Sequence, residues 1–199
     1  MPSEMNAASG LTPWKVKKRD LVFEISPWFA VFREEVLLPD GRVVQDYYQI
    51  DQPDFVSIVA VNTKQEALGL WRYKHGPRCV NLGVPAGYLK PGEDPLTGAK
   101  RELVEECALN AKKWTLLGSL AVDGNRSQMR AHIFLAEGLE PTTAVYSDDL
   151  ETAVPVWLTT SAWRKHLSNG DIKTMGAATA MMWAFSWIES HVDHGSSVT

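Results

Sequence analysis

The stretch over residues 94–107 constrains the fold of this chain more than any other. Asp94 followed by Pro95 is typical of a helix start, and the pattern predicts a helix that runs to about Cys107. Because each helical residue turns by about 100°, apolar side chains line up along one face. That apolar face consists of Leu96, Ala99, Leu103 and Cys107. The helix must therefore pack against another element that buries it.

Acidic side chains stand beside this apolar face. The same turn of about 100° per residue places Glu102 and Glu106 next to each other at its edge, with Glu105 adjacent. Like charges four residues apart repel by about 0.2–0.5 kcal/mol when they are exposed. A bound Mg²⁺ or Mn²⁺ removes this conflict, because such cations prefer carboxylate oxygens. A solvated acidic helix face is the alternative, and it is common for this pattern alone.

The residues before the helix favour the metal-binding hypothesis. Gly87 and Glu93 precede the acidic face in a strand–loop–helix setting. Glycines at positions 87 and 92 let the loop turn sharply and bring backbone close to a ligand. We expect Arg101 to pair with Glu93, which would attach the loop to the helix.

Short β-like segments dominate the rest of the chain. Two strands, 28–37 and 42–50, are joined by Pro39-Asp40-Gly41 and predict a hairpin. Further strands are expected over 55–62, 67–73, 114–122, 130–136 and 154–158, and further helices over 161–167 and 174–191. The irregular alternation predicts an α/β fold, with a mixed β-sheet sandwiched between helices and an N-terminal antiparallel β-hairpin region.

The domain organisation follows from these elements. We expect flexible tails over 1–13 and 193–199, an N-terminal β region over 14–54 and the main domain over 55–192. The last helix is rich in alanine and methionine, and its Trp183 and Trp187 are four residues apart. We interpret this row as core or dimer packing.

Charge and cysteine content exclude several classes of protein. The 20 Lys and Arg residues against 24 Asp and Glu residues give a net charge of −4, which argues against nucleic-acid binding. Neither a secretory signal nor a membrane-spanning run is visible. The two cysteines, Cys79 and Cys107, lack metal-ligand spacing and fit a reduced, cytoplasmic setting. Cys107 is expected to be a buried small hydrophobe, and His75 a hydrogen-bonding group in a loop.

The stretch from Gly87 to Leu109 resembles the Nudix box. The matching positions are Gly87, Glu93, Arg101, Glu102, Leu103, Glu105, Glu106 and Leu109. Ala108 stands where the box has glycine, and we expect the helix to run on so that Asn110 makes the turn. Beyond the box, the chain is similar to the ADP-ribose/ADP-sugar pyrophosphatase branch. The features that carry this similarity are Pro39-Asp40-Gly41, Tyr73-x-His75-Gly76, Pro85-Ala86-Gly87 and Asn169-Gly170-Asp171-Ile172-Lys173.

The resemblance implies hydrolysis of a nucleoside diphosphate linked to another group, with Mg²⁺ or Mn²⁺ as cofactor. It implies metal ligation by the Ala86 carbonyl and by the carboxylates of Glu102, Glu105 and Glu106. Glu93 would orient Arg101 in support of these ligands. The general base would come from a loop after the box. Glu151 is the first candidate, and Asp148, Asp149 and Glu105 are the alternatives.

Substrate contacts are expected from charged and aromatic side chains. Arg72, Lys74 and Arg126 are candidates for the phosphates, although each type is more often a surface charge. The branch usually has arginine at the position of Lys74. Trp28 or Phe29 is a candidate for stacking on adenine, the alternative being a core position. The resemblance also implies a homodimer through exchanged strands within residues 28–50.

Other functions stay open at this stage. The chain could be a nucleotide-binding sensor of the same fold without turnover, or a pyrophosphatase for another nucleotide sugar such as GDP-mannose. An isomerase of the same superfamily would need a catalytic cysteine in the sheet, and Cys79 is expected in a loop. The complete carboxylate set argues against a sensor, and the resemblance implies a hydrolase of a small nucleotide, most of all of ADP-ribose or an ADP-sugar.

Overall fold

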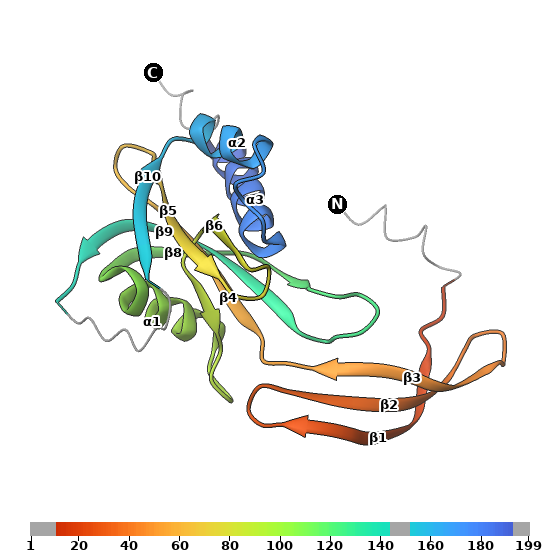
Figure 1. Cartoon of the computed structure of the whole chain (residues 1–199). Coiled ribbons are helices and arrows are strands. Elements are labelled where there is room, and N and C mark those ends of the chain that lie inside the picture. Colours follow the sequence, from red (N-terminus) through yellow and green to blue (C-terminus); the bar gives the residue numbers. More distant parts are fainter. Residues whose placement is uncertain (1–10, 144–151, 193–199) are drawn as a thin grey trace. The chain divides into compact units, whose positions relative to one another are not determined.

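The computed structural model describes residues 11–143 and 152–192 and is shown in Figure 1. The chain divides into two compact units. The first comprises the chain up to Pro53 together with Ala121–Met129, and the second comprises Asp54–Leu120 together with the chain from Arg130 onwards. None of the helices in the described part is both long and apolar enough to cross a membrane.

The first unit is built on a three-stranded antiparallel sheet. Its strands are β1 (Lys15–Ile25), β2 (Phe29–Leu37) and β3 (Val43–Asp51), in the order β1-β2-β3. The hairpin expected from the sequence joins β2 and β3. Its turn is closed by a bond of 2.8 Å from Leu38 N to Arg42 O, with Gly41 at a φ of 86°. β1 was not expected from the sequence.

The second unit contains a seven-stranded mixed sheet. Five strands follow the order β10-β5-β4-β9-β8, while β6 pairs with β5 and β7 pairs with β4. β4 and β9 run in parallel, and β5 runs antiparallel to β4, β6 and β10. The strand bounds are Phe55–Val61 for β4, Ala67–Lys74 for β5, Cys79–Gly83 for β6, Ala86–Tyr88 for β7, Leu109–Ala121 for β8, Arg130–Pro141 for β9 and Ala153–Leu158 for β10.

Helices cover both faces of this sheet (Figure 1). They are α1 (Pro95–Cys107), α2 (Thr160–Ser168) and α3 (Met175–Val192). On one face, Ala99 and Leu103 of α1 pack with Val56 and Ile58 of β4. The opposite face is covered by α2 and α3, and its core includes Val59, Leu135, Trp163, Ala180 and Met181. The predicted fold class is confirmed, and the alanine-rich row of α3 belongs to the core.

The end of α1 differs from the expectation. Ala108 itself adopts the left-handed conformation, with φ 52° and ψ 39°, so the helix does not run on to Asn110. The cause is that β8 begins at Leu109, which forces the chain to reverse at once. At the other end, Asp94 caps α1 as predicted, and its carboxylate accepts from Thr97 N at 3.1 Å.

Two short strands also escaped the sequence analysis. β7 is too short for an alternating pattern to be visible, and β6 begins at Cys79. The expectation that Cys79 lies in a loop is therefore wrong, because the preceding turn ends at Arg78 and Cys79 pairs with Lys74 of β5.

Candidate active site

The position of the Glu102 carboxylate against β7 depends on a glycine. β7 pairs with β4 so that Gly87 lies opposite Val56 and Ala86 opposite Ser57. A Cβ atom at Gly87 would lie 2.1 Å from the carboxyl carbon of Glu102, so any side chain there would push the carboxylate out of its place. The spacing between Gly87 and Glu102 in the sequence therefore has a steric reason: the strand must leave room for the carboxylate.

We call Glu93, Arg101, Glu102 and Glu105 the loop side of α1. Within this group, Arg101 holds the three carboxylates in place. Arg101 donates to both oxygens of Glu93, at 2.8 Å each, which confirms the predicted pair. It also donates to Glu102 at 2.6 Å, to Glu105 at 2.8 Å and to the Tyr88 carbonyl at 3.1 Å. The hydrogen bonds from Arg101 lower the pKa of Glu93 to about 2, and those accepted by Glu93 raise the pKa of Arg101.

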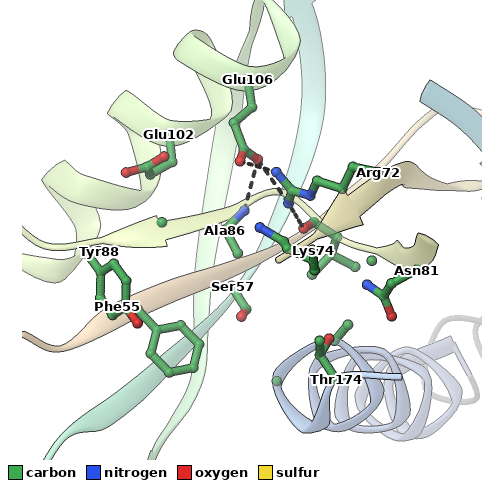
Figure 2. A pocket seen from close by; sticks show the side chains of 15 residues that line it. Phe55, Ser57, Arg72, Lys74, Asn81, Ala86, Tyr88, Glu102, Glu106 and Thr174 are labelled. Carbon is green, nitrogen blue, oxygen red and sulfur yellow. Dashed lines mark hydrogen bonds and ion pairs between the residues drawn. The ribbon is translucent and has the colours of Figure 1, made fainter. Parts of the chain in front are cut away.

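We call Arg72, Val84, Ala86 and Glu106 the sheet side of α1. A second arginine, Arg72, binds the carboxylate there. Arg72 forms a hydrogen-bonded ion pair with Glu106 and donates to the Val84 carbonyl at 2.8 Å. The Ala86 N–H donates to the same Glu106 carboxylate at 3.0 Å (Figure 2). The two charged side chains are only 4% and 5% exposed. Burial raises the pKa of Glu106, and the guanidinium of Arg72 opposes this shift.

These side chains border a cavity of about 660 Å³, a volume that suits a small-molecule ligand. Its walls come from β4, β5, β6, β7, α1 and the start of α3. The polar and aromatic lining residues labelled in Figure 2 include Phe55, Ser57, Arg72, Lys74, Asn81, Tyr88, Glu102, Glu106 and Thr174. Phe55 and Tyr88 form an edge-to-face pair with ring centroids 6.3 Å apart.

The structure brings together part of the predicted site. Ala86, Arg72, Lys74, Glu102 and Glu106 all line the cavity. Glu93, Arg101 and Glu105 surround the loop side of α1 and are not among the lining residues. The proposed bases Glu151, Asp148 and Asp149 lie outside the described residues.

Two predicted substrate contacts belong to the first unit. Trp28 lies between β1 and β2 and is 64% exposed, so it is not a core residue. Phe29 begins β2 and packs at 6.0 Å against the ring of Phe23. Arg126 lies over the ring of Tyr47 at 5.5 Å. Phe29 and Arg126 thus have side-chain partners within their own unit, and the contact of all three residues with a substrate stays a prediction.

Sequence reasoning missed Ser57, Asn81 and Thr174 as cavity residues. Ser57 interrupts the apolar strand β4, and Asn81 stands between Val80 and Leu82 of β6. A lone polar residue in an apolar strand was the available signal, since buried polar groups need partners.

A hydrogen-bonded chain, also missed, links the ends of neighbouring strands next to the site. His132 of β9 contacts Asp54 at 3.0 Å and Ser119 of β8 at 2.7 Å. The main-chain carbonyl of Asp54 accepts from Leu89 N at 2.8 Å, just after β7. This chain connects β4, β8 and β9 with the loop that carries Glu93.

The oxygen atoms at the cavity are of the chemical types that bind a hard divalent cation. Carboxylates and a main-chain carbonyl are the ligands that Mg²⁺ and Mn²⁺ prefer. Within the described ranges, no three Asp, Glu, His or Cys side chains lie close enough together to hold a metal. The reason is visible in the contacts, because Arg101 and Arg72 hold the α1 carboxylates on two different sides. Metal binding at Glu106 therefore requires that Arg72 give up part of its pair.

His75 has the place expected for it, while Cys107 is only partly buried and packs against the core beneath α1. Burial raises the pKa of the Cys107 thiol to about 12, which leaves it a poor nucleophile. His75 follows β5 in a turn, and its Nδ1 lies 3.3 Å from the Tyr73 hydroxyl.

Comparison with known proteins places this geometry in a family. The NUDIX domain matches residues 52–174. An ADP-ribose pyrophosphatase of Bacillus subtilis (strain 168) is 29% identical over 109 residues, which is 55% of this chain and 58% of the relative. An ADP-ribose pyrophosphatase of Mycobacterium tuberculosis (strain ATCC 25618 / H37Rv) is 34% identical over 114 residues, 56% of this chain and 54% of the relative.

A third relative bears a different name. The methanol dehydrogenase activator of Bacillus methanolicus is 27% identical over 106 residues, 53% of this chain and 57% of the relative. The chain thus spans a little over half the length of the curated relatives it matches. The solved structure of an ADP compounds hydrolase shares the fold, with a TM-score of 0.78, 21% identity and coverage of 90% of this chain and 96% of that one. The NUDIX match includes the sheet, the glycine-bearing strand and helix α1, and extends over more than half of the chain, so the protein belongs to the Nudix family.

Proposed function

We propose that this protein hydrolyses the pyrophosphate bond of ADP-ribose or an ADP-sugar in the presence of Mg²⁺ or Mn²⁺, giving AMP and a sugar phosphate. The observation that carries the proposal is the pair of carboxylates, Glu102 and Glu106, that α1 presents to one cavity. Two relatives named ADP-ribose pyrophosphatase support the choice of substrate.

Each box residue has a proposed task. The carboxylates of Glu102 and Glu106 and the carbonyl of Ala86 would hold the cation, with Glu105 as a further ligand. When bound, a divalent cation neutralises the diphosphate and makes a water molecule nucleophilic. Arg101 and Glu93 orient Glu102 through the bonds described above.

Arg72 and Lys74 of β5 supply positive charge to the same cavity. The fork of Arg72 is suited to a phosphoryl group, because its N–H donors match two oxygens at once. A diphosphate entering the cavity competes with Glu106 for this fork and frees the carboxylate for the cation. The general base is proposed to be Glu151, with Asp148, Asp149 and Glu105 as alternatives, and Trp28 and Arg126 are proposed to contact the nucleotide.

A homodimer is part of the proposal. The three-stranded sheet of the first unit exposes large apolar side chains, each 45–64% exposed. They include Val16, Leu21, Val22, Phe23, Ile25 and Trp28. An apolar area of this kind marks an interaction surface, and a second copy of the chain would cover it. Light scattering at micromolar concentration tests this, and a monomer contradicts it.

Hydrolysis assays test the catalytic proposal. We expect release of AMP from ADP-ribose with Mg²⁺ or Mn²⁺, none after EDTA, and lower rates with GDP-mannose or NADH. Glu102→Gln and Glu106→Gln should lower kcat by about 100-fold or more, since each removes a metal ligand. Glu140→Gln is the matched control, because Glu140 forms an exposed pair with Lys112. Binding without turnover over the whole panel would instead favour a nucleotide sensor.

A further inference from the structure

The cavity has a second polar end, away from the α1 carboxylates. We name it the donor end and define it by Ser57 of β4, Asn81 of β6 and the residues Thr174 and Gly176 at the start of α3. Figure 2 shows the side chains of Ser57, Asn81 and Thr174 around the same hollow as Lys74. Ser57 and Asn81 are each only 1% exposed, yet both line the cavity.

The Ser57 hydroxyl is available to donate a hydrogen bond to a ligand. Its strand is otherwise apolar, and none of the described residues forms a hydrogen bond with this side chain. A Cβ atom on Gly176 would lie 3.8 Å from Ser57 Oγ, which places the hydroxyl directly beside the start of α3. A buried hydroxyl without a protein partner is rare, and a ligand is one reason to keep it.

Asn81 adds two more donors in a fixed orientation. Its Oδ1 accepts from Lys173 N at 2.6 Å, and this bond assigns the amide so that Nδ2 is the free end. Nδ2 lies 3.2 Å from the place of a Cβ atom on Gly83, another lining residue. None of the described residues accepts a hydrogen bond from Nδ2.

The start of α3 completes the set. The Thr174 carbonyl accepts from Ala178 N at 3.1 Å, so the amides of residues 175–177 have no acceptor within the helix. Side chains of Asp94 and Thr159 cap α1 and α2, and no such cap is found at α3 in the described part of the chain. The first turn of an 18-residue helix also carries a partial positive charge.

We propose that the donor end binds a phosphoryl group of the substrate. Ser57, Asn81 and the first amides of α3 can all donate hydrogen bonds, and Lys74 adds a positive charge, whereas the carboxylates of the described lining residues come only from α1. An anionic phosphoryl group gains from both the donors and the positive charge, while a neutral sugar hydroxyl gains only from the donors. The inference rests on the proposed function, because the diphosphate would then span the cavity. One phosphoryl group lies at Ser57 and Asn81, and the other at the carboxylate end.

A titration with inorganic phosphate tests the site without catalysis. In ¹H–¹⁵N NMR spectra, phosphate should shift the amides of Gly176 and Ala177 and the side-chain amide of Asn81, and neutral ribose should not. Absence of these shifts in the wild-type protein overturns the proposal, as do equal shifts with ribose.

Three variants separate binding from folding. Asn81→Asp keeps the acceptor for Lys173 N and replaces the Nδ2 donor by a negative oxygen, so phosphate shifts should vanish. Ser57→Ala removes only the hydroxyl and should weaken phosphate binding. Gly176→Ala puts a methyl group into the donor end, 3.4 Å from Phe55, in ordinary contact. Because alanine suits a helix better than glycine, this variant should melt no lower than wild type while losing the phosphate shifts.

Kinetics with ADP-ribose distinguish this proposal from the proposed function. Ser57→Ala and Asn81→Asp should raise KM about tenfold, the loss expected for one charge-assisted hydrogen bond, with a smaller change in kcat. Glu140→Gln should change neither. If wild-type protein hydrolyses no nucleotide, the proposed function fails while the phosphate titration still decides the donor end. If hydrolysis proceeds and the variants retain wild-type KM and phosphate shifts, the donor end fails alone.

Discussion

Helix α1 is neutralised on two sides by two arginines in very different surroundings. On the loop side, Arg101 reaches Glu93, eight residues earlier, and shares its donors with Glu102 and Glu105. Its side chain is 18% exposed, and that of Glu105 is 33% exposed. On the sheet side, Arg72 and Glu106 are 34 residues apart in sequence and almost completely buried.

The two sides of α1 therefore differ in how much stability depends on a single contact. The loop-side carboxylates share one cation, so the loss of any single contact leaves others in place. On the sheet side, removing either partner leaves a buried charge without its counter-ion, which is costly. Glu106 is also a proposed metal ligand. The same carboxylate would therefore contribute both to stability and to the proposed catalysis.

The largest effect on stability should come from Arg72→Met. The substitution leaves the carboxylate of Glu106 buried without its ion-pair partner, and we expect a loss of about 3–5 kcal/mol in the free energy of unfolding. Urea unfolding followed by circular dichroism measures it. The double variant Arg72→Met/Glu106→Met should recover most of this loss, because two apolar side chains need no counter-ion. A double variant as unstable as the single one would show that the pair is not the cause.

The Arg72–Glu106 pair also affects the expected stability of Glu106→Gln. From the sequence alone, this substitution should spare the fold and lower only turnover. The structure adds a cost, because Arg72 would lose its charged partner in a buried place. Activity of this variant therefore has to be compared at equal folded fraction, with Glu102→Gln beside it.

Glu93→Gln should have the second largest effect. The pKa of Glu93 is lowered from its usual value to about 2, so the ionised carboxylate stabilises the folded state. This contribution is complete above the unfolded pKa of 4.5 and is lost as pH falls toward 2. We expect a cost of about 2 kcal/mol at pH 7. Urea unfolding at pH 3 should show less than half of the pH 7 difference, and a constant difference would contradict the assignment.

Local signals explain what the sequence predicted well. Asp94-Pro95 fixed the start of α1, and the spacing of Glu93 and Arg101 predicted their ion pair, because both depend on residues within a few helical turns. The mainly apolar run of β4 was also visible. Such features need no knowledge of which strand lies next to which.

Long-range pairing explains what the sequence could not predict. Arg72 was expected to face a substrate, and only the packing of β5 against α1 shows that it also pairs with Glu106. Ser57 and Asn81 acquire a meaning only when β4, β6 and α3 meet at one cavity. At Ala108, local preference gave the wrong answer because the immediate start of β8 overrides the cost of a left-handed alanine.

The cost of the left-handed alanine gives the third prediction, at the C-terminal end of α1. Ala108→Gly should stabilise the protein by about 1 kcal/mol, because glycine adopts φ 52° without a Cβ clash. Thermal and urea unfolding measure the gain. Lys100→Gly is the control, since it puts glycine at an exposed position inside the helix, where a loss of about 1 kcal/mol is expected. A loss in both variants would mean that the left-handed turn is not present.

The smallest effect should come from Glu105→Gln, which tests the loop side directly. Glu105 is one-third exposed and shares Arg101 with two other carboxylates, so its removal should cost no more than about 0.5 kcal/mol. Urea unfolding beside Glu106→Gln checks the comparison, because the buried carboxylate should cost several times more. If the two variants lose equal stability, the two sides of α1 are not different in kind. A kcat that falls in Glu105→Gln at unchanged stability would then assign Glu105 to metal binding or to the general base.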